Sequence, residues 1–183
     1  MPRKLTASFY MSLDGIVDAP QEWHFPHVDD EMMADAAGSL GESDTILLGR
    51  KTYEEWAAFW PGQGDGNPMA EYFNGTPKVV ASTTLDTLDW QNSTLISSDV
   101  ATTVYKLKGQ PGKNISVTGS GTLVRSLLRA QLVDELRLMV HPIVVGHGKR
   151  LFDSGDERSL FELAESKVYS TGVLSLTYTP APA

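Results

Sequence analysis

The hydrophobic positions of this chain alternate between short continuous runs, typical of buried strands, and residues spaced three or four apart, typical of helices. The predicted strands cover residues 4–12, 45–48, 78–82, 115–118, 135–145, 159–170 and 173–179. The predicted helices include residues 28–40, 53–57, 100–107 and 123–132, and residues 61–76 are expected to form an exposed loop. Strands that alternate with helices and end in an antiparallel pair predict a mixed α/β sheet within one domain.

The segment from Ile115 to Leu128 predicts a strand that passes through a glycine turn into an amphipathic helix. Glycine permits a tight bend and lets a ligand approach the backbone. The first turn of the helix offers unpaired N–H groups and the positive end of its dipole to an anion. We therefore expect a cofactor phosphate or pyrophosphate there, and expect Gly121 to need either a positive φ or space beside that group. The alternative is a plain strand-to-helix turn that binds nothing.

Four of the predicted strands are followed by polar or glycine-rich residues. These four strand ends are residues 12–18, 49–52, 82–84 and 119–122. In α/β sheets, ligands bind beyond the carboxyl ends of the strands. The pattern therefore predicts that the four ends meet at one cleft.

The second of these strand ends, residues 49–52, suits a phosphate group. Arg50, Lys51 and Thr52 provide two cations and a hydroxyl at the start of a helix. The alternative is that both cations are solvated surface residues. Asp44 stands where the first glycine of a P-loop would be, and Val124 replaces the third glycine of a Rossmann fingerprint, so neither fold is predicted.

Composition narrows the function classes. The 183 residues carry a net charge of −8, which argues against a nucleic-acid partner. The absence of cysteine excludes disulfides, a thiolate nucleophile and cysteine-ligated zinc. His24 and His27 lie in a proline-interrupted loop and are expected to be incidental rather than metal ligands, so no metal site is predicted. No membrane span or signal peptide is recognisable, which predicts a cytoplasmic protein.

Six segments, taken together and in this order, resemble the dihydrofolate reductase-like superfamily. They are Ser12–Gly15, Leu47–Glu54, Lys78–Leu85, Val117–Gly121, Val133–Leu136 and Pro142–Phe152. The chain is most similar to stand-alone proteins that resemble the reductase domain of bacterial riboflavin biosynthesis. The resemblance implies a three-layer α/β/α fold, a bound NADPH and a homodimer.

The resemblance also implies residue roles. The implied cofactor-binding residues are Gly15, Ile16, Gly49, Arg50, Lys51, Thr52, Ser82, Thr83, Gly119, Ser120, Gly121, Thr122 and Leu123. Thr83 stands where relatives often carry an arginine, which weakens the inference of NADPH over NADH. Glu31 falls nearest the place of the carboxylate that anchors substrate in dihydrofolate reductases, with Asp30 next, and Asp14 lies near the nicotinamide.

These residues predict an NADPH-dependent reductase of a small pterin- or pyrimidine-type heterocycle, with Glu31 and Asp14 as candidates for substrate orientation or proton supply. The cofactor would carry the hydride chemistry while the protein orients both reactants. The alternative is a nucleotide-binding sensor or regulator that kept the cofactor cleft without turnover.

Overall fold

The computed structural model of the protein describes residues 2–64 and 66–181. Within these ranges, eight strands form one sheet in the order β4-β3-β2-β5-β1-β6-β8-β7. The strands are β1 (Leu5–Ser12), β2 (Ser43–Gly49), β3 (Lys78–Ala81), β4 (Ser93–Ile96), β5 (Asn114–Thr118), β6 (Glu135–His141), β7 (Phe161–Val168) and β8 (Leu174–Pro180).

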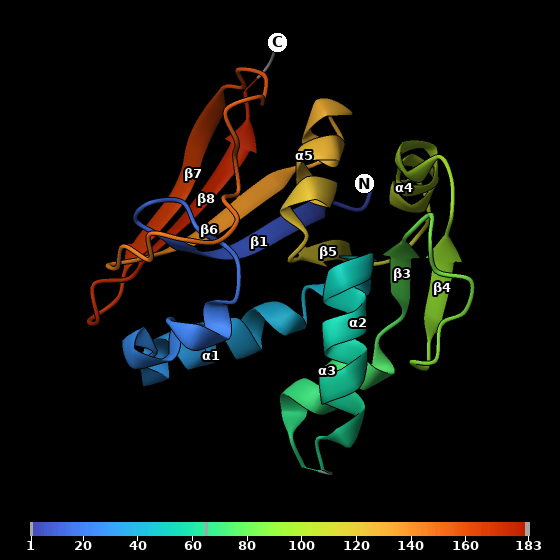
Figure 1. The fold of residues 1–183 in the computed structure, drawn as a ribbon, viewed down its shortest axis with the longest axis horizontal. Coiled ribbons are helices and arrows are strands. Elements are labelled where there is room, and N and C mark those ends of the chain that lie inside the picture. Colours follow the sequence, from blue (N-terminus) through green and yellow to red (C-terminus); the bar gives the residue numbers. More distant parts are fainter. Residues whose placement is uncertain (1, 65, 182–183) are drawn as a thin grey trace.

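Helices cover both faces of the sheet. They are α1 (Asp30–Leu40), α2 (Arg50–Phe59), α3 (Pro68–Gly75), α4 (Val100–Lys108) and α5 (Gly121–Arg129), with short 3-10 helices at Pro20–Glu22, Phe25–His27 and Trp60–Gly62. Figure 1 shows α4 and α5 on one face and α1, α2 and α3 on the other, which confirms the predicted three-layer architecture. None of the helices in the described ranges has the length and apolar character needed to cross a membrane.

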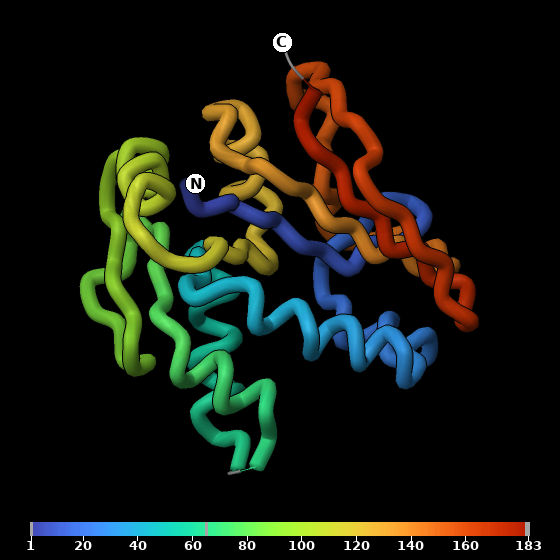
Figure 2. The backbone as a smooth tube through the Cα atoms, turned by 180° about the vertical axis from the view of Figure 1, so that it is seen from behind, coloured from blue at the N-terminus to red at the C-terminus, as the bar shows by residue number. Residues whose placement is uncertain are grey.

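The directions of the strands bring the predicted strand ends to one edge. From β4 to β6, neighbouring strands are parallel, whereas β8 is antiparallel to β6 and β7 to β8. The β7–β8 hairpin closes one end of the sheet (Figure 2). Gly49 pairs with Ala81, and Leu47 pairs with Val117, so β2, β3 and β5 end side by side. The mixed sheet and its terminal antiparallel pair are therefore confirmed.

The two faces of the central strands differ in chemistry because side chains alternate along a strand. On one face, Leu5, Ala7 and Phe9 of β1 belong to a buried apolar cluster that includes residues of α4 and α5. The alternate positions on β1 and β5 are polar: Thr6, Ser8, Ser116 and Thr118. This hydroxyl-bearing face lies under α1.

Two sequence predictions of secondary structure were wrong, and one element was missed. Residues 61–76 are not a simple exposed loop, because α3 occupies Pro68–Gly75 and buries Phe73. The Asn67 side chain caps this helix by accepting from the amides of residues 69 and 70, and Pro68 is its first residue. Asn-Pro is a recognised helix start, but both residues are also common in loops, and the sequence prediction treated them as part of a loop. The strand predicted over 135–145 ends at His141, before Pro142, and β4 was not predicted.

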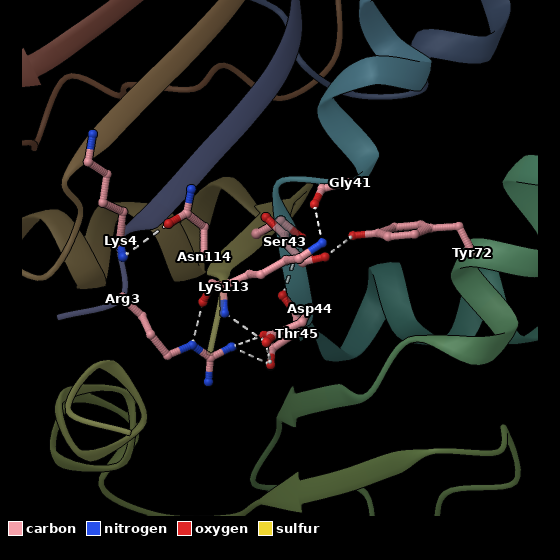
Figure 3. Close-up of polar contacts among 10 residues, drawn as sticks. Arg3, Lys4, Gly41, Ser43, Asp44, Thr45, Tyr72, Lys113 and Asn114 are labelled. Carbon is pink, nitrogen blue, oxygen red and sulfur yellow. Dashed lines mark hydrogen bonds and ion pairs between the residues drawn. The ribbon is translucent and has the colours of Figure 1, made fainter. Parts of the chain in front are cut away.

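An ionic cluster fixes the amino ends of the central strands, opposite the candidate site (Figure 3). The Arg3 guanidinium is 7% exposed and binds the Asp44 carboxylate. It also donates to Thr45 Oγ1 at 2.6 Å and to the Lys113 carbonyl oxygen at 2.5 Å. Asp44 and Thr45 lie in β2 and Lys113 directly precedes β5, so one buried cation links the starts of β1, β2 and β5. Because these strands are fixed at their amino ends, their carboxyl ends are held in a defined register relative to one another.

Three histidines gather with the rings of Tyr10, Trp23 and Phe25 near the ends of β1 and β6. His141 is fully buried, and its Nε2 atom has no hydrogen-bond partner within the described ranges. His24 stacks on Tyr10 with a ring-centroid distance of 4.5 Å, and His27 lies 5.9 Å from His141. Among the described residues, no group of three or more histidine or acidic side chains is arranged to hold a metal ion. This arrangement is a packed aromatic cluster.

We predict that this cluster makes stability fall in mild acid. Burial, with smaller contributions from His141 and His27, lowers the pKa of His24 to about 4 from an ordinary 6.5, and burial also lowers the pKa of His141. In the unfolded chain these histidines bind protons near pH 6.5, whereas in the folded protein they stay neutral to a lower pH. The stability that is present above pH 6.5 is therefore lost as the pH falls toward 4. Thermal unfolding at pH 7 and pH 5 should show this loss.

A matched pair of variants tests the source of that loss. His24→Phe keeps a ring against Tyr10 but cannot titrate, so its Tm should fall less between pH 7 and pH 5 than that of the wild type, by roughly 2 °C or more. His147→Gln removes an exposed histidine and should behave as the wild type. Equal losses in the two variants would contradict the role of His24.

Candidate active site

The turns that follow β2 and β5 pack directly against each other. A Cβ atom added at Gly49 would collide with the Ser120 side chain, and one added at Gly119 would lie 2.8 Å from Thr52 Oγ1. Gly119 has φ +80° and Ser120 has φ +50°. The positive φ expected at Gly121 therefore falls at the two preceding residues. An added Cβ at Gly121 would make only ordinary contacts, with no atom nearer than 3.7 Å.

The first turn of α2 is poised for an anion. Its N-cap, Gly49, has no side chain to accept from the first amides of the helix, and the turn contains no acidic residue. It carries Arg50 and Lys51 instead, although the positive end of a helix dipole disfavours cations. Arg50 is bound to Glu54 one turn later at 3.0 Å. Unpaired amides beside cations are a suitable binding site for a phosphate.

A lysine from a distant segment adds to this positive region. The Lys149 carbonyl accepts from the Val17 amide at 2.9 Å, which holds residue 149 beside the β1 strand end. The neighbouring Lys149 ammonium lowers the pKa of Lys51, since the two positive charges oppose each other. The sequence analysis did not assign Lys149, because the closeness of residues 51 and 149 arises only from the fold.

Asp14 organises the loop after β1. Its carboxylate accepts from the Ser12 hydroxyl at 2.6 Å and from the Val145 and Gly146 amides at 3.1 and 2.9 Å. The Ser12 hydroxyl, with the two amides, lowers the pKa of Asp14 to about 2. An ionised carboxylate with three donors is well suited to fixing the 143–151 segment and poorly suited to giving up a proton. Its predicted place near the nicotinamide stays a prediction.

Two other backbone contacts complete this edge. The Leu151 amide donates to the Gly15 carbonyl at 3.0 Å, and buried Ile16 pairs with Arg150 in an isolated bridge. The Arg125 guanidinium on α5 donates to the Leu151 carbonyl at 2.9 Å. The loop after β1, the 143–151 segment and α5 are thus held together around the strand ends.

The remaining predicted cofactor residues differ in their surroundings. The buried Ser82 hydroxyl accepts from the amides of residues 84 and 85 at 3.2 and 3.1 Å, so it shapes the turn after β3. Thr83 and Thr122 are exposed, whereas the Leu123 side chain is buried in the core. The Leu123 amide is capped by Ser120 Oγ at 3.4 Å. Thr83 and Thr122 are accessible to a ligand, and Leu123 contributes through packing.

A cavity of about 590 Å³ lies between α1 and the hydroxyl-bearing face of the sheet. We call it the sheet-face cavity. Its polar and charged lining residues include Thr6, Ser8, Tyr10, Asp35, Glu42, Ser43, Ser116, Thr118, Arg137, Glu165, Lys167, Tyr169, Ser175 and Thr177. It exists because α1 carries small residues toward the sheet, including Ala34 and Gly38. Thr118 directly precedes Gly119, so the cavity reaches the glycine turn.

An acidic side chain of α1 lines this cavity, but it is not Glu31. Asp35, one turn later, accepts from Lys167 Nζ at 2.5 Å and from the Tyr169 hydroxyl at 2.8 Å. These two hydrogen bonds, that of Lys167 first, lower the pKa of Asp35. Glu31 is not among the lining residues, and its 57% exposed side chain pairs with Lys167 at 2.9 Å.

The resemblance pointed to Glu31, with Asp30 next, and did not indicate Asp35. The helical spacing of four between Glu31 and Asp35 places both on one face of α1, and could have suggested either residue. The sequence does not show how far α1 lies from the sheet, and this distance decides which turn of the helix faces the cavity. Tyr169 and Lys167 were missed because they come from the distant β7–β8 hairpin.

Comparisons with known proteins identify the family. The family model described as the RibD C-terminal domain matches residues 3–175. The uncharacterized protein YyaP of Bacillus subtilis is 31% identical over 180 residues, covering 96% of this chain and 94% of that protein. These two similarities cover nearly the whole chain and confirm the resemblance seen in the sequence.

Solved structures show the same fold at lower identity. A candidate riboflavin biosynthesis protein from Shewanella sp. PV-4 superposes with a TM-score of 0.76 at 20% identity over 100% of both chains. A diaminohydroxyphosphoribosylaminopyrimidine deaminase/5-amino-6-(5-phosphoribosylamino)uracil reductase from Thermotoga maritima superposes with a TM-score of 0.68 at 11% identity. That alignment covers 98% of this chain and 57% of the other. On the family match and the shared fold, this chain belongs to the RibD C-terminal domain family.

Proposed function

We propose that this protein is an NADPH-dependent reductase of a small pyrimidine- or pterin-type heterocycle. The observation that carries the proposal is the position of the sheet-face cavity directly beside two anion-suited helix starts. A phosphate-bearing cofactor and a polar ring could therefore meet at Thr118 and Gly119. The family includes a uracil reductase, which supports the reaction class.

The residues at the strand ends are suited to a cofactor with several phosphates. The unpaired amides of the α2 first turn and the cations Lys51 and Lys149 suit an anion, which would relieve the repulsion between the two lysines. Gly119 lets the β5 turn approach Thr52 closely, so the starts of α2 and α5 lie beside the same region. When bound there, NADPH would supply the hydride.

The chain's own contribution is orientation of the substrate. In the proposed arrangement, the ionised Asp35 carboxylate accepts from N–H groups of the heterocycle, a stronger hydrogen bond than one between neutral groups. Burial, followed by Asp35, raises the pKa of Tyr169 to about 12, so this hydroxyl keeps its proton and continues to orient the carboxylate. The hydroxyls of the sheet face bind other polar substituents. Solvent at the open side of the cavity provides the proton that accompanies the hydride.

A nucleotide-binding regulator without turnover is the second candidate. It would use the same strand ends but has no need of a lined cavity beside them. Oxidation of NADPH in the presence of 5-amino-6-(5-phosphoribosylamino)uracil, its 5′-dephosphorylated counterpart and dihydrofolate separates the two functions. Binding of NADPH without oxidation across aminouracils and pterins would favour the regulator.

We predict that Lys51→Met weakens NADPH binding roughly tenfold or more and NADH binding by less, because the variant loses one charge-assisted contact to a phosphate. Fluorescence titration of both cofactors measures the effect. Lys106→Met removes an exposed cation from the last turn of α4, which adjoins Arg3 at the opposite edge of the sheet, and should change neither affinity. Unchanged NADPH affinity in Lys51→Met would remove this lysine from the cofactor site.

We predict that Asp35→Asn lowers kcat/KM for the active heterocycle roughly tenfold to a hundredfold and leaves the Kd of NADPH unchanged, because the ionised acceptor for substrate is lost. Glu31→Gln is the matched control, since Glu31 lies on the same helix and shares Lys167 but does not line the cavity. If only Glu31→Gln lost turnover, the substrate-binding carboxylate would be Glu31 and not Asp35.

A further inference from the structure

Every cation that lines the sheet-face cavity is already bound by two carboxylates. Arg137 on β6 pairs with Glu42 at 2.8 Å and with Glu135 at 2.9 Å. Lys167 on β7 pairs with Asp35 at 2.5 Å and with Glu31 at 2.9 Å. The lining residues therefore hold these two cations against three carboxylates, because Glu165 lines the cavity as well.

The rest of the lining combines apolar residues, such as Phe9 and Met139, with neutral hydrogen-bonding groups. Seven serine and threonine hydroxyls come from four strands of the sheet: Thr6, Ser8, Ser43, Ser116, Thr118, Ser175 and Thr177. Thr6 is 5% exposed, and its Oγ1 atom has no hydrogen-bond partner within the described ranges. The Nε atom of Arg137 is likewise buried and unpartnered within those ranges. Buried polar atoms without partners are rare in folded proteins, so these two atoms point to a ligand that hydrogen-bonds them.

The charges at the neighbouring strand ends are arranged in the opposite way. There, Lys51 and Lys149 face each other, and within the described ranges neither forms an ion pair with a carboxylate, although the Asp18 charge acts on Lys51. In the proposed function these cations are taken by the cofactor phosphates. Positive charge available for phosphates thus lies on the cofactor side, and an excess of carboxylates lies on the substrate side.

We propose that the sheet-face cavity selects an unphosphorylated substrate: a neutral or singly protonated heterocycle whose other polar groups are hydroxyls. This inference rests on the proposed reductase function. A phosphate in the cavity would meet three carboxylates and would have to break existing ion pairs to reach Arg137 or Lys167. A ribosyl or similar polyol group would instead satisfy the hydroxyls of the sheet face and the unpartnered Thr6 oxygen.

A matched pair of compounds tests the proposal with the intact protein loaded with NADPH. The pair is the aminouracil ribotide named above and its 5′-dephosphorylated counterpart, compared by calorimetric affinity and by NADPH oxidation. The dephosphorylated compound should bind with a roughly tenfold or greater advantage, with a matching advantage in kcat/KM. Equal or stronger binding of the phosphorylated compound would overturn the inference and leave the reductase function standing.

Other outcomes separate this inference from the proposed function. If NADPH binds and neither aminouracil binds, the assignment of a hydroxyl-bearing heterocycle to the cavity is overturned. If NADPH itself does not bind, the proposed function fails instead. These readings need only the wild-type protein, so they do not depend on whether a variant folds.

A charge variant tests the physical cause. Glu42→Gln releases one of the two carboxylates from Arg137 and should narrow the preference for the dephosphorylated compound by severalfold, by improving the affinity of the phosphorylated one. Glu157→Gln removes an exposed carboxylate from the 152–159 loop beside α5 and should leave the preference unchanged. An unchanged preference in folded Glu42→Gln would contradict the role of charge balance at Arg137.

Discussion

The close contact between the β2 and β5 turns is the constraint on which the candidate site depends. Neither Gly49 nor Gly119 has room for a side chain, because Ser120 and Thr52 occupy the space beside them. The two turns can approach this closely because β2 and β5 are parallel neighbours in register. Their approach brings the starts of α2 and α5 to one region, where the amide groups of both helices can address one ligand.

The second determinant of the site is a helix that packs loosely. At its start, α1 is held by Met32 against Tyr169 and Val173, and at its end Leu40 contacts the cluster around β2 and β3. Small residues between these two contacts leave the hydroxyl-bearing face of the sheet uncovered. A sheet face that carries threonine and serine at successive inward positions does not gain the apolar burial of its opposite face. We interpret the hydroxyl-bearing face as a binding surface whose polar residues lower the stability of the folded protein.

Much of the fold could be predicted from sequence because local sequence patterns identify the strands. The β-branched runs at 45–48 and 115–118, with glycines directly after them, indicate both the strands and their functional ends. The α3 helix was missed because its signal, the Asn67-Pro68 start, is short and lies among loop-forming residues. The end of β6 was misplaced because the apolar residues after Pro142 continue the pattern of a strand that proline in fact ends.

The candidate site could be predicted only where its residues adjoin strand ends. Arg50 and Lys51 follow β2 directly, so their place was readable from spacing. Lys149 and Lys167 reach the candidate site through tertiary contacts with residues far away in the sequence. No local sequence pattern predicts such contacts. The choice between Glu31 and Asp35 depends on how α1 sits over the sheet, which the helical period alone leaves open.

Hydrogen–deuterium exchange of the backbone amides, with and without NADPH, tests the central claim most directly. The account predicts that NADPH slows exchange in the first turns of α2 and α5, around residues 50–52 and 121–122, since their amides would bind the cofactor phosphates. It predicts little change in the β7–β8 hairpin. Protection confined to the hairpin or to α1, with unchanged exchange at both helix starts, would contradict the account.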